Sequence, residues 1–196
     1  GVSSINMLGS DEQKHDFLPK IVSGELTTAL AIDEGNHHNP FDIETTAKLE
    51  GDYWVLNGKK VFVIDGASAD IILIVARTSG KSGDSNGISV FTTTKNTAGI
   101  NISKISTADS RNYANIEMSN LKLEQGALLG ENDLAGEIIE KVLDLGRIAI
   151  SAEMLGNTEE AFDITLNYLK ERKQFGVQIG SFQALQHRAA KMFCEI

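Results

Sequence analysis

The chain has 196 residues, of which 41% are hydrophobic and 23% charged, so it can bury a core and is not generally disordered. Its 18 Lys and Arg against 27 Asp and Glu give a formal net charge of -9, which argues against a nucleic-acid binder and against binding to anionic membranes. The longest apolar run, residues 71–76, suits a buried strand and is far shorter than the roughly 20 residues that cross a bilayer. The single cysteine, Cys194, excludes an internal disulfide and a cysteine-clustered metal site. We therefore expect a cytoplasmic (bacterial) or equivalent reducing compartment.

The first 24 residues are polar and have a helical composition, with Gly24 as the expected stop. Pro19 lies inside this stretch, which predicts a short or broken helix. At the other end, residues 189–196 still have the composition of a helix interior, so we expect a piece of a longer protein.

Residues 25–130 are dominated by short β-rich runs. Glu50-Gly51-Asp52 and Asn57-Gly58 are typical of hairpin turns, and residues 79–87 of a solvated loop. About eight short strands without a long helix between them predict an antiparallel barrel or sandwich. The expected strands are residues 28–32, 45–49, 53–56, 61–64, 71–76, 88–91, 100–105 and 113–118.

From Leu134 the apolar residues recur at helical spacing, which predicts a helix of roughly 30 residues or more. Residues 174–180 interrupt this pattern, and Ser181 is a candidate cap of a second helix. We therefore expect an α+β chain, with an antiparallel β-barrel or sandwich over residues 25–130. Long helices of an antiparallel bundle follow over residues 131–196, where the bundle is cut short.

The segment from Lys170 to His187 presents an Arg, a Gln and a Phe at a glycine-bracketed corner between the two helices. A guanidinium beside an aromatic ring can bind phosphate and stack on a planar ring system. On composition alone, the same segment also fits an ordinary helix–turn–helix corner with a solvated basic end.

The order of motifs resembles the acyl-CoA dehydrogenase family over essentially the whole chain. In that comparison, residues 1–24 correspond to the end of the N-terminal helical domain, residues 25–130 to the middle β domain, and residues 131–196 to the first part of the C-terminal bundle. The segments that carry the resemblance are Gly9-Ser10-Asp11-Glu12-Gln13-Lys14, Trp54-Val55-Leu56-Asn57-Gly58-Lys59-Lys60, Gly66-Ala67-Ser68-Ala69-Asp70, Leu143-Asp144-Leu145-Gly146-Arg147-Ile148-Ala149, Arg172-Lys173-Gln174-Phe175-Gly176 and Phe182-Gln183-Ala184-Leu185-Gln186-His187.

The resemblance implies an FAD-dependent enzyme that oxidises an acyl-CoA thioester between its α and β carbons, with hydride transfer to flavin N5. It also implies an electron-transfer flavoprotein as electron acceptor, and a homo-oligomer, a dimer or tetramer, in which FAD is shared across subunits. No nucleic acid, membrane or metal is implied. Residues 109–112 correspond to a loop near the CoA thioester, so Arg111 is a candidate contact to substrate or to a partner subunit, and a solvated turn fits these residues equally well. The implied cofactor-binding residues are Leu30, Ile32, Asp33, His38, Asn39, Phe62, Val63, Ile64, Arg172, Gln174, Phe175, Ile179, Phe182 and Leu185.

Several positions depart from the family's pattern. Asp33 stands where the family has a threonine and Asn39 where it has a serine, and Ile64 replaces a threonine hydroxyl. Asp33 beside a flavin would oppose the negative charge of the reduced form unless a hydrogen-bond donor offsets it. Gly146 occupies a position where some members carry the catalytic base, so the base is expected downstream of Ile196.

Two alternatives stay open besides a dehydrogenase: a degenerate, non-catalytic subunit of a mixed complex, and an acyl-CoA oxidase. The adjacent His37 and His38 are residues of a type that binds metals, but neighbouring histidines in a loop point different ways and no third spaced ligand is evident, so no metal is expected.

Overall fold

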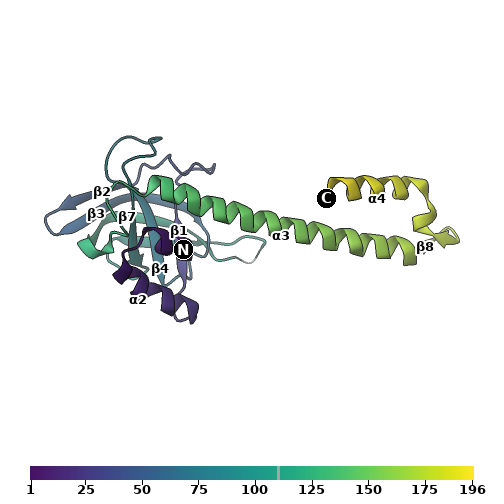
Figure 1. Ribbon diagram of the computed structural model, residues 1–196, viewed down its shortest axis with the longest axis horizontal. Coiled ribbons are helices and arrows are strands. Elements are labelled where there is room, and N and C mark those ends of the chain that lie inside the picture. The colour runs from purple at the N-terminus through teal and green to yellow at the C-terminus, as the bar shows by residue number, and fades with distance from the viewer. Residues whose placement is uncertain (110) are drawn as a thin grey trace. The chain divides into compact units, whose positions relative to one another are not determined.

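The computed structural model describes residues 1–109 and 111–196, which form two compact units, residues 1–142 and 143–196 (Figure 1). Ser110, within the turn expected at residues 109–112, lies outside the described residues. In the part of the chain that is described, no helix is long and apolar enough to span a membrane.

Two helices open the first unit, α1 (Val2–Leu8) and α2 (Asp11–Val22). Ser10 and Gln13 form a capping box at the start of α2. At its end, the Gly24 amide donates to Ile21 and the Glu25 amide to Lys20, which is a Schellman motif with Gly24 at φ +80°, so the expected stop is confirmed.

Of the short or broken helix expected around Pro19, the short one is found: α2 has 12 residues and continues through Pro19 to Val22, so a break there is wrong. Proline removes only one amide donor, the one that would bond to the carbonyl of His15. His15 is exposed, so water can satisfy its carbonyl, and the amide of Ser23 still donates to the Pro19 carbonyl at 2.9 Å.

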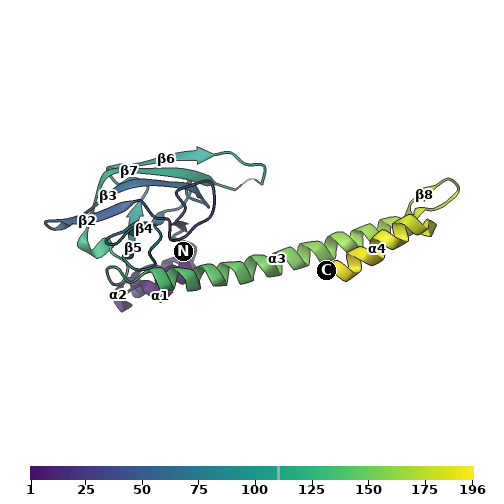
Figure 2. The same ribbon diagram turned by 90° about the horizontal axis from the view of Figure 1, so that it is seen from above.

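Seven strands form one sheet in the order β1-β4-β2-β3-β7-β6, with β5 paired to β4. Figure 2 shows this sheet curling, with β6, β7 and β3 following one another along one side. The strands are β1 (Thr28–Ala31), β2 (Thr46–Glu50), β3 (Tyr53–Val63), β4 (Ile71–Arg77), β5 (Ile88–Thr94), β6 (Ile100–Ile105) and β7 (Tyr113–Glu124). A short 3-10 turn, η1 (Gln125–Ala127), follows β7.

The α+β class is confirmed, but the sheet is mixed rather than wholly antiparallel. β4 pairs antiparallel with β5 along one edge and parallel with β1, and at one residue pair with β2, along the other. The parallel pairs arise because the β2–β3 hairpin intervenes between β1 and β4, so the chain re-enters β4 in the direction in which it left β1.

The hairpin turn expected at Asn57-Gly58 is wrong, because these residues lie within the continuous strand β3. Gly58 has φ +149°, and the register with β7 shifts between Leu56 and Gly58, so the strand bends there without reversing. The side chain of Asn57 is used in pairing, since its Oδ1 accepts the Asn120 amide at 2.8 Å. The other expected turn is confirmed, with Gly51 at φ +61° between β2 and β3.

The core of the first unit lies against this sheet. Trp54 and Phe91 meet edge to face there, with ring centroids 5.1 Å apart. Gln13 joins α2 to the segment after β7, since its Nε2 donates to the Leu128 carbonyl at 2.7 Å. The buried cluster comprises Ala29, Ala31, Ala47, Trp54, Leu56, Val63, Ala69, Ile72, Ile74, Ala76, Phe91, Ile116, Met118, Leu121 and Leu123.

Helix α3 (Gly136–Glu171) begins in the first unit and supplies most of the second. It is followed by the hairpin β8 (Lys173–Gln174) and β9 (Val177–Gln178), the 3-10 turn η2 (Ile179–Ser181) and helix α4 (Gln183–Glu195). Phe162 of α3 contacts Phe193 of α4, with centroids 6.0 Å apart, so α4 runs back along the end of α3 (Figure 1).

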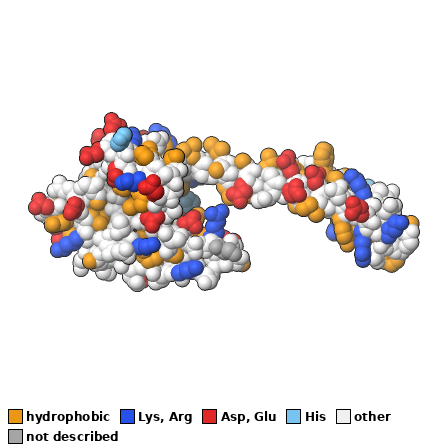
Figure 3. All heavy atoms as spheres, turned by 90° about the horizontal axis from the view of Figure 1, so that it is seen from below, with side chains coloured by type: hydrophobic (Ala, Val, Ile, Leu, Met, Phe, Trp, Pro, Cys, Tyr) orange, Lys and Arg blue, Asp and Glu red, His pale blue; other side chains and the backbone are white. Residues whose placement is uncertain are grey.

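Ser181 does not cap α4, contrary to expectation. The cap residue is Phe182, and the Ser181 hydroxyl instead donates to the Gln178 carbonyl at 2.7 Å within η2. None of residues 143–196 is buried, and Figure 3 shows hydrophobic side chains on the surface of these helical segments.

Candidate functional site

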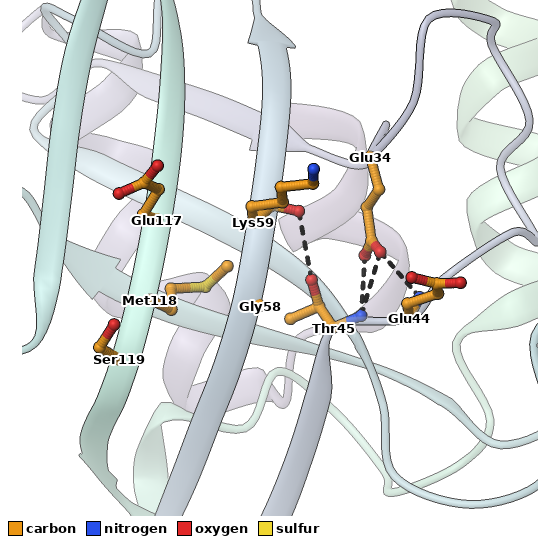
Figure 4. A pocket seen from close by; sticks show the side chains of 8 residues that line it. All are labelled: Glu34, Glu44, Thr45, Gly58, Lys59, Glu117, Met118 and Ser119. Carbon is orange, nitrogen blue, oxygen red and sulfur yellow. Dashed lines mark hydrogen bonds between the residues drawn. The ribbon is translucent and has the colours of Figure 1, made fainter.

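The loop between β1 and β2, residues 32–45, carries most of the polar site residues expected from the sequence. Lys60 anchors its start: this side chain is fully buried, and its Nζ lies 2.6 Å from Glu34 Oε1 and 2.9 Å from the Ile32 carbonyl. The Glu34 carboxylate also accepts the amides of Glu44 and Thr45 at 2.8 and 3.1 Å (Figure 4). One buried ion pair therefore joins both ends of the loop to β3.

Burial lowers the pKa of Lys60 from 10.5 to about 8, and the negative charge and hydrogen bond of Glu34 oppose this shift. The ion pair thus holds a charge in a place where desolvation disfavours it.

Arg77, at the end of β4, anchors the other end of the loop. It is 7% exposed, and its Nε and Nη2 donate to the carbonyls of Ile43 and Phe41 at 3.0 and 3.1 Å. Its guanidinium also donates to three carbonyls of the β4–β5 loop: Ser79, Asp84 and Asn86. Every one of these acceptors is a main-chain oxygen.

Sequence reasoning missed these two anchors as site-building residues. Lys60 was noted only within a motif, and Arg77 was not singled out. A usable signal exists for Arg77, which directly follows the apolar, strand-forming run of residues 71–76, whereas Lys60 follows the polar residues 57–59 and gives no comparable signal.

Between the anchors, three of the expected residues come together. Nδ1 of His38 lies 3.0 Å from both carboxylate oxygens of Asp33, and the Asn39 amide donates to Asp33 Oδ1 at 3.3 Å. The Asp33 and His38 side chains are 30% and 50% exposed. The Val61 amide donates to the Asp33 carbonyl at 2.8 Å, so this group lies beside the end of β3.

The end of β3 presents two apolar side chains to solvent, Phe62 at 61% and Ile64 at 55% exposure. Phe62 has φ +50°, its amide donates to Asn115 Oδ1 at 3.2 Å, and its ring meets Tyr113 edge-on at 5.9 Å. Val63 between them is buried. Ile32 is buried and Leu30 half-buried, so their side chains belong to the packing below the loop.

The turn with Arg111 is linked to Phe62 through Tyr113. Asp109 accepts hydrogen bonds from the Thr107 hydroxyl, the Arg111 amide and the Tyr113 hydroxyl. The Thr107 hydrogen bond is the main reason why the pKa of Asp109 is lowered, and the bond to Asp109 raises the pKa of Tyr113. The Arg111 side chain is exposed.

The remaining expected residues gather at the β8–β9 hairpin in the second unit. The Ile179 amide donates to the Arg172 carbonyl at 2.9 Å, which closes the hairpin. Phe175 lies at its tip with φ +53° and 91% exposure, and its ring meets Phe182 edge-on at 6.2 Å. Arg172 is exposed at the base of the same hairpin and Gln174 is exposed next to its tip, and Leu185 is half-buried on the first turns of α4.

A separate groove of about 480 Å³ lies beside β3 and β7 (Figure 4). A Cβ at Gly58 would lie 2.4 Å from the Thr45 hydroxyl oxygen, so β3 can approach Thr45 this closely because residue 58 has no side chain. The groove is lined by Glu34, Glu44, Thr45, Gly58, Lys59, Glu117, Met118 and Ser119. None of these is among the cofactor-binding residues that the resemblance implies.

Gly146 lies on α3 and has no side chain, so that position supplies no catalytic base. Among residues 1–109 and 111–196, no three His, Cys, Asp or Glu side chains are grouped as metal ligands.

Two family models match the chain: the acyl-CoA dehydrogenase middle domain over residues 30–125 and the acyl-CoA dehydrogenase C-terminal domain over residues 136–196. Curated relatives include the short-chain specific acyl-CoA dehydrogenase of Clostridium acetobutylicum, 36% identical over 97% of this chain and 51% of the relative. The 3-(aryl)acrylate reductase of Clostridium sporogenes is 34% identical over 95% of this chain and 50% of the relative. The chain therefore spans about half the length of the curated relatives it matches.

Solved structures give the same result. An acyl-CoA dehydrogenase from Geobacillus kaustophilus has a TM-score of 0.91 and 31% identity, over 98% of this chain and 52% of that one. An FAD complex of PigA has a TM-score of 0.91 and 28% identity, over 98% and 51%.

Proposed function

The chain belongs to the acyl-CoA dehydrogenase family, and we propose that the complete gene product is an FAD-dependent acyl-CoA dehydrogenase. In this proposal an acyl-CoA thioester is oxidised between its α and β carbons. When bound, FAD supplies the hydride acceptor, and the electrons leave through an electron-transfer flavoprotein. The base that removes the α proton lies outside residues 1–196. We place the protein in a reducing compartment such as the bacterial cytoplasm, which suits the exposed, free Cys194.

The observation that carries the proposal is the surface where the β1–β2 loop meets the end of β3. Phe62 and Ile64 offer exposed apolar contact directly beside the polar Asp33, His38 and Asn39. This mixture fits a flavin ring, which has an apolar face and a polar pyrimidine edge. The two segments are held together by the main-chain hydrogen bond between Val61 and Asp33. The ion pair between the adjacent residues Lys60 and Glu34 reinforces it.

The β8–β9 hairpin supports the second part of the proposal, a binding surface for the pyrophosphate and adenosine of FAD. Holding Phe175 at positive φ costs about 1–3 kcal/mol, and yet its ring remains 91% exposed. A planar ligand or another subunit that stacks on this ring would use the exposed surface. We assign Arg172 to phosphate and Gln174 and Phe175 to adenosine, in FAD shared across a dimer or tetramer.

The test is flavin retention in the complete gene product. Arg172→Ala should lose most of its bound flavin on dialysis, while Arg188→Ala, which removes an exposed arginine of α4 outside the hairpin, should retain it. Flavin content is measured by absorbance after protein denaturation. Equal retention in both variants would contradict the role of Arg172.

Anaerobic titration of the yellow protein with a panel of acyl-CoAs then tests the reaction. Bleaching by one thioester supports the dehydrogenase, and oxygen consumption without another acceptor would assign an oxidase instead. A colourless protein that gains no flavin on reconstitution would indicate a non-catalytic subunit, for which the substitutions Asp33, Asn39 and Ile64 are the relevant residues.

A further inference from the structure

The hydrogen-bonded pair of Asp33 and His38 lies on the surface that we assign to the flavin. His38 Nδ1 is 3.0 Å from both Asp33 oxygens, and both side chains are partly exposed. The Asp33 carboxylate is therefore partly open to solvent and does not belong to a fully buried ion pair. Its side-chain hydrogen-bond partner is the imidazole of His38, five residues along the same loop.

Two other charged groups lie near Asp33 on the buried side. Lys60 is close enough for the Asp33 charge to raise the Lys60 pKa, but its ammonium is bound to Glu34 at 2.6 Å. Glu34 and Lys60 together carry no net charge when both are ionised. On the exposed side, the hydrogen bond from the His38 ring is the side-chain contact that acts on the negative charge of Asp33.

A carboxylate beside a flavin affects its two oxidation states unequally. Reduction adds electron density to the ring, so a negative charge nearby disfavours the reduced form and lowers the reduction potential. An imidazole that donates to this carboxylate, and cancels its charge when doubly protonated, reverses the effect.

We propose that His38 is a positioning residue that acts through Asp33 to raise the reduction potential of the bound flavin. This inference rests on the proposed function, because it requires FAD at the loop. The competing structural explanation is that Asp33 only closes the loop by accepting the Asn39 amide and the His38 ring. That role would affect stability and leave the potential unchanged.

The experiment measures the midpoint potential of the flavin in the complete gene product by spectroelectrochemistry, together with the Kd for oxidised FAD. Asp33→Asn keeps an acceptor oxygen for the Asn39 amide and removes the charge. His38→Gln keeps a donor and removes the ring. His37→Gln is the matched control, since it removes the adjacent exposed imidazole.

We expect Asp33→Asn to raise the potential and His38→Gln to lower it. Each shift corresponds to about a tenfold change in the ratio of affinities for reduced and oxidised flavin, or about 30 mV for a two-electron couple. The double variant should match Asp33→Asn, because His38 acts only through the carboxylate, and His37→Gln should match the unmodified protein.

Two results overturn the inference in distinguishable ways. A protein that binds no FAD removes the proposed function together with this inference. A flavoprotein whose potential is the same in all variants, or in which His38→Gln shifts it equally with and without Asp33, removes this inference alone. If Asp33→Asn does not fold, Asp33→Thr replaces it with the same expected direction.

Discussion

The two units of this chain use their apolar residues in opposite ways. In residues 1–142, large side chains such as Phe91 and Leu56 are fully buried against the sheet. In residues 143–196, none is buried, and the exposed ones include Leu145, Ile148, Ile150, Met154, Leu155, Ile164, Tyr168, Phe175, Phe182 and Phe193. The first unit is therefore stabilised by side-chain burial. The second relies on main-chain helix bonds and a few local contacts, which are marginal without tertiary packing.

Two phenylalanine substitutions test this contrast directly. Phe91→Ala should lower the free energy of unfolding by about 3–5 kcal/mol, because it leaves a cavity in the core. Phe193→Ala, which removes a ring that is 70% exposed and meets Phe162 of α3 with centroids 6.0 Å apart, should cost less than about 1 kcal/mol. Urea denaturation followed by circular dichroism measures both. Similar costs would mean that the two units do not differ in this way.

Within β3 the same contrast occurs between neighbouring lysines. Lys60→Met should destabilise the protein by about 3–5 kcal/mol, since it leaves the Glu34 carboxylate without its cation and the Ile32 carbonyl without a donor. Lys59→Met changes an exposed residue and should stay within about 0.5 kcal/mol of the unmodified protein. Denaturant midpoints at neutral pH compare them, and a small effect at Lys60 would show that the buried pair contributes little.

The lowered pKa of Lys60 also predicts a smaller, pH-dependent effect. Between its folded value of about 8 and its unfolded value of 10.5, the unfolded state holds the proton and the folded state does not. The free energy of unfolding should therefore rise with pH in this window, relative to Lys60→Met, by at most about 1.4 kcal/mol per pH unit. Denaturation curves measured across this window check the sign. A relative fall would mean that Lys60 stays charged in the folded protein above its unfolded pKa.

Much of the fold follows from local pattern. The α+β class, the order of strands and helices, the Gly51 turn and the helix end at Gly24 are all visible in the sequence, because each depends on nearby residues. The errors at Pro19 and Asn57-Gly58 have different causes. At Pro19 the helix continues because the freed carbonyl of His15 is exposed to water, which the residue identities do not reveal. At Asn57-Gly58 the chain stays extended because it pairs with β7, which is distant in the sequence.

The residues of the candidate site also fall into two groups, those that the sequence indicates and those that it does not. The positions of Asp33, Asn39, Phe62 and Ile64 came from a family resemblance, and their assignment to FAD remains a prediction. The sequence anticipated that Asp33 would need an offsetting donor, and His38 was named as a site residue, but not as that donor, since the loop conformation decides which of two adjacent histidines faces the carboxylate. The cage of carbonyls around Arg77 was equally invisible, because main-chain acceptors leave no trace in residue identity.

The main-chain acceptors around Arg77 affect how the β1–β2 loop can change in evolution. Arg77 holds the loop through the oxygens of Phe41 and Ile43, and any residue at those positions offers the same oxygen. Mutations that change side chains there leave the anchor's acceptors in place, so the shape of the loop is partly decoupled from its sequence. A family member can then exchange the residues between its anchors, as at Asp33 and His38, and sample new surface chemistry on an inherited backbone.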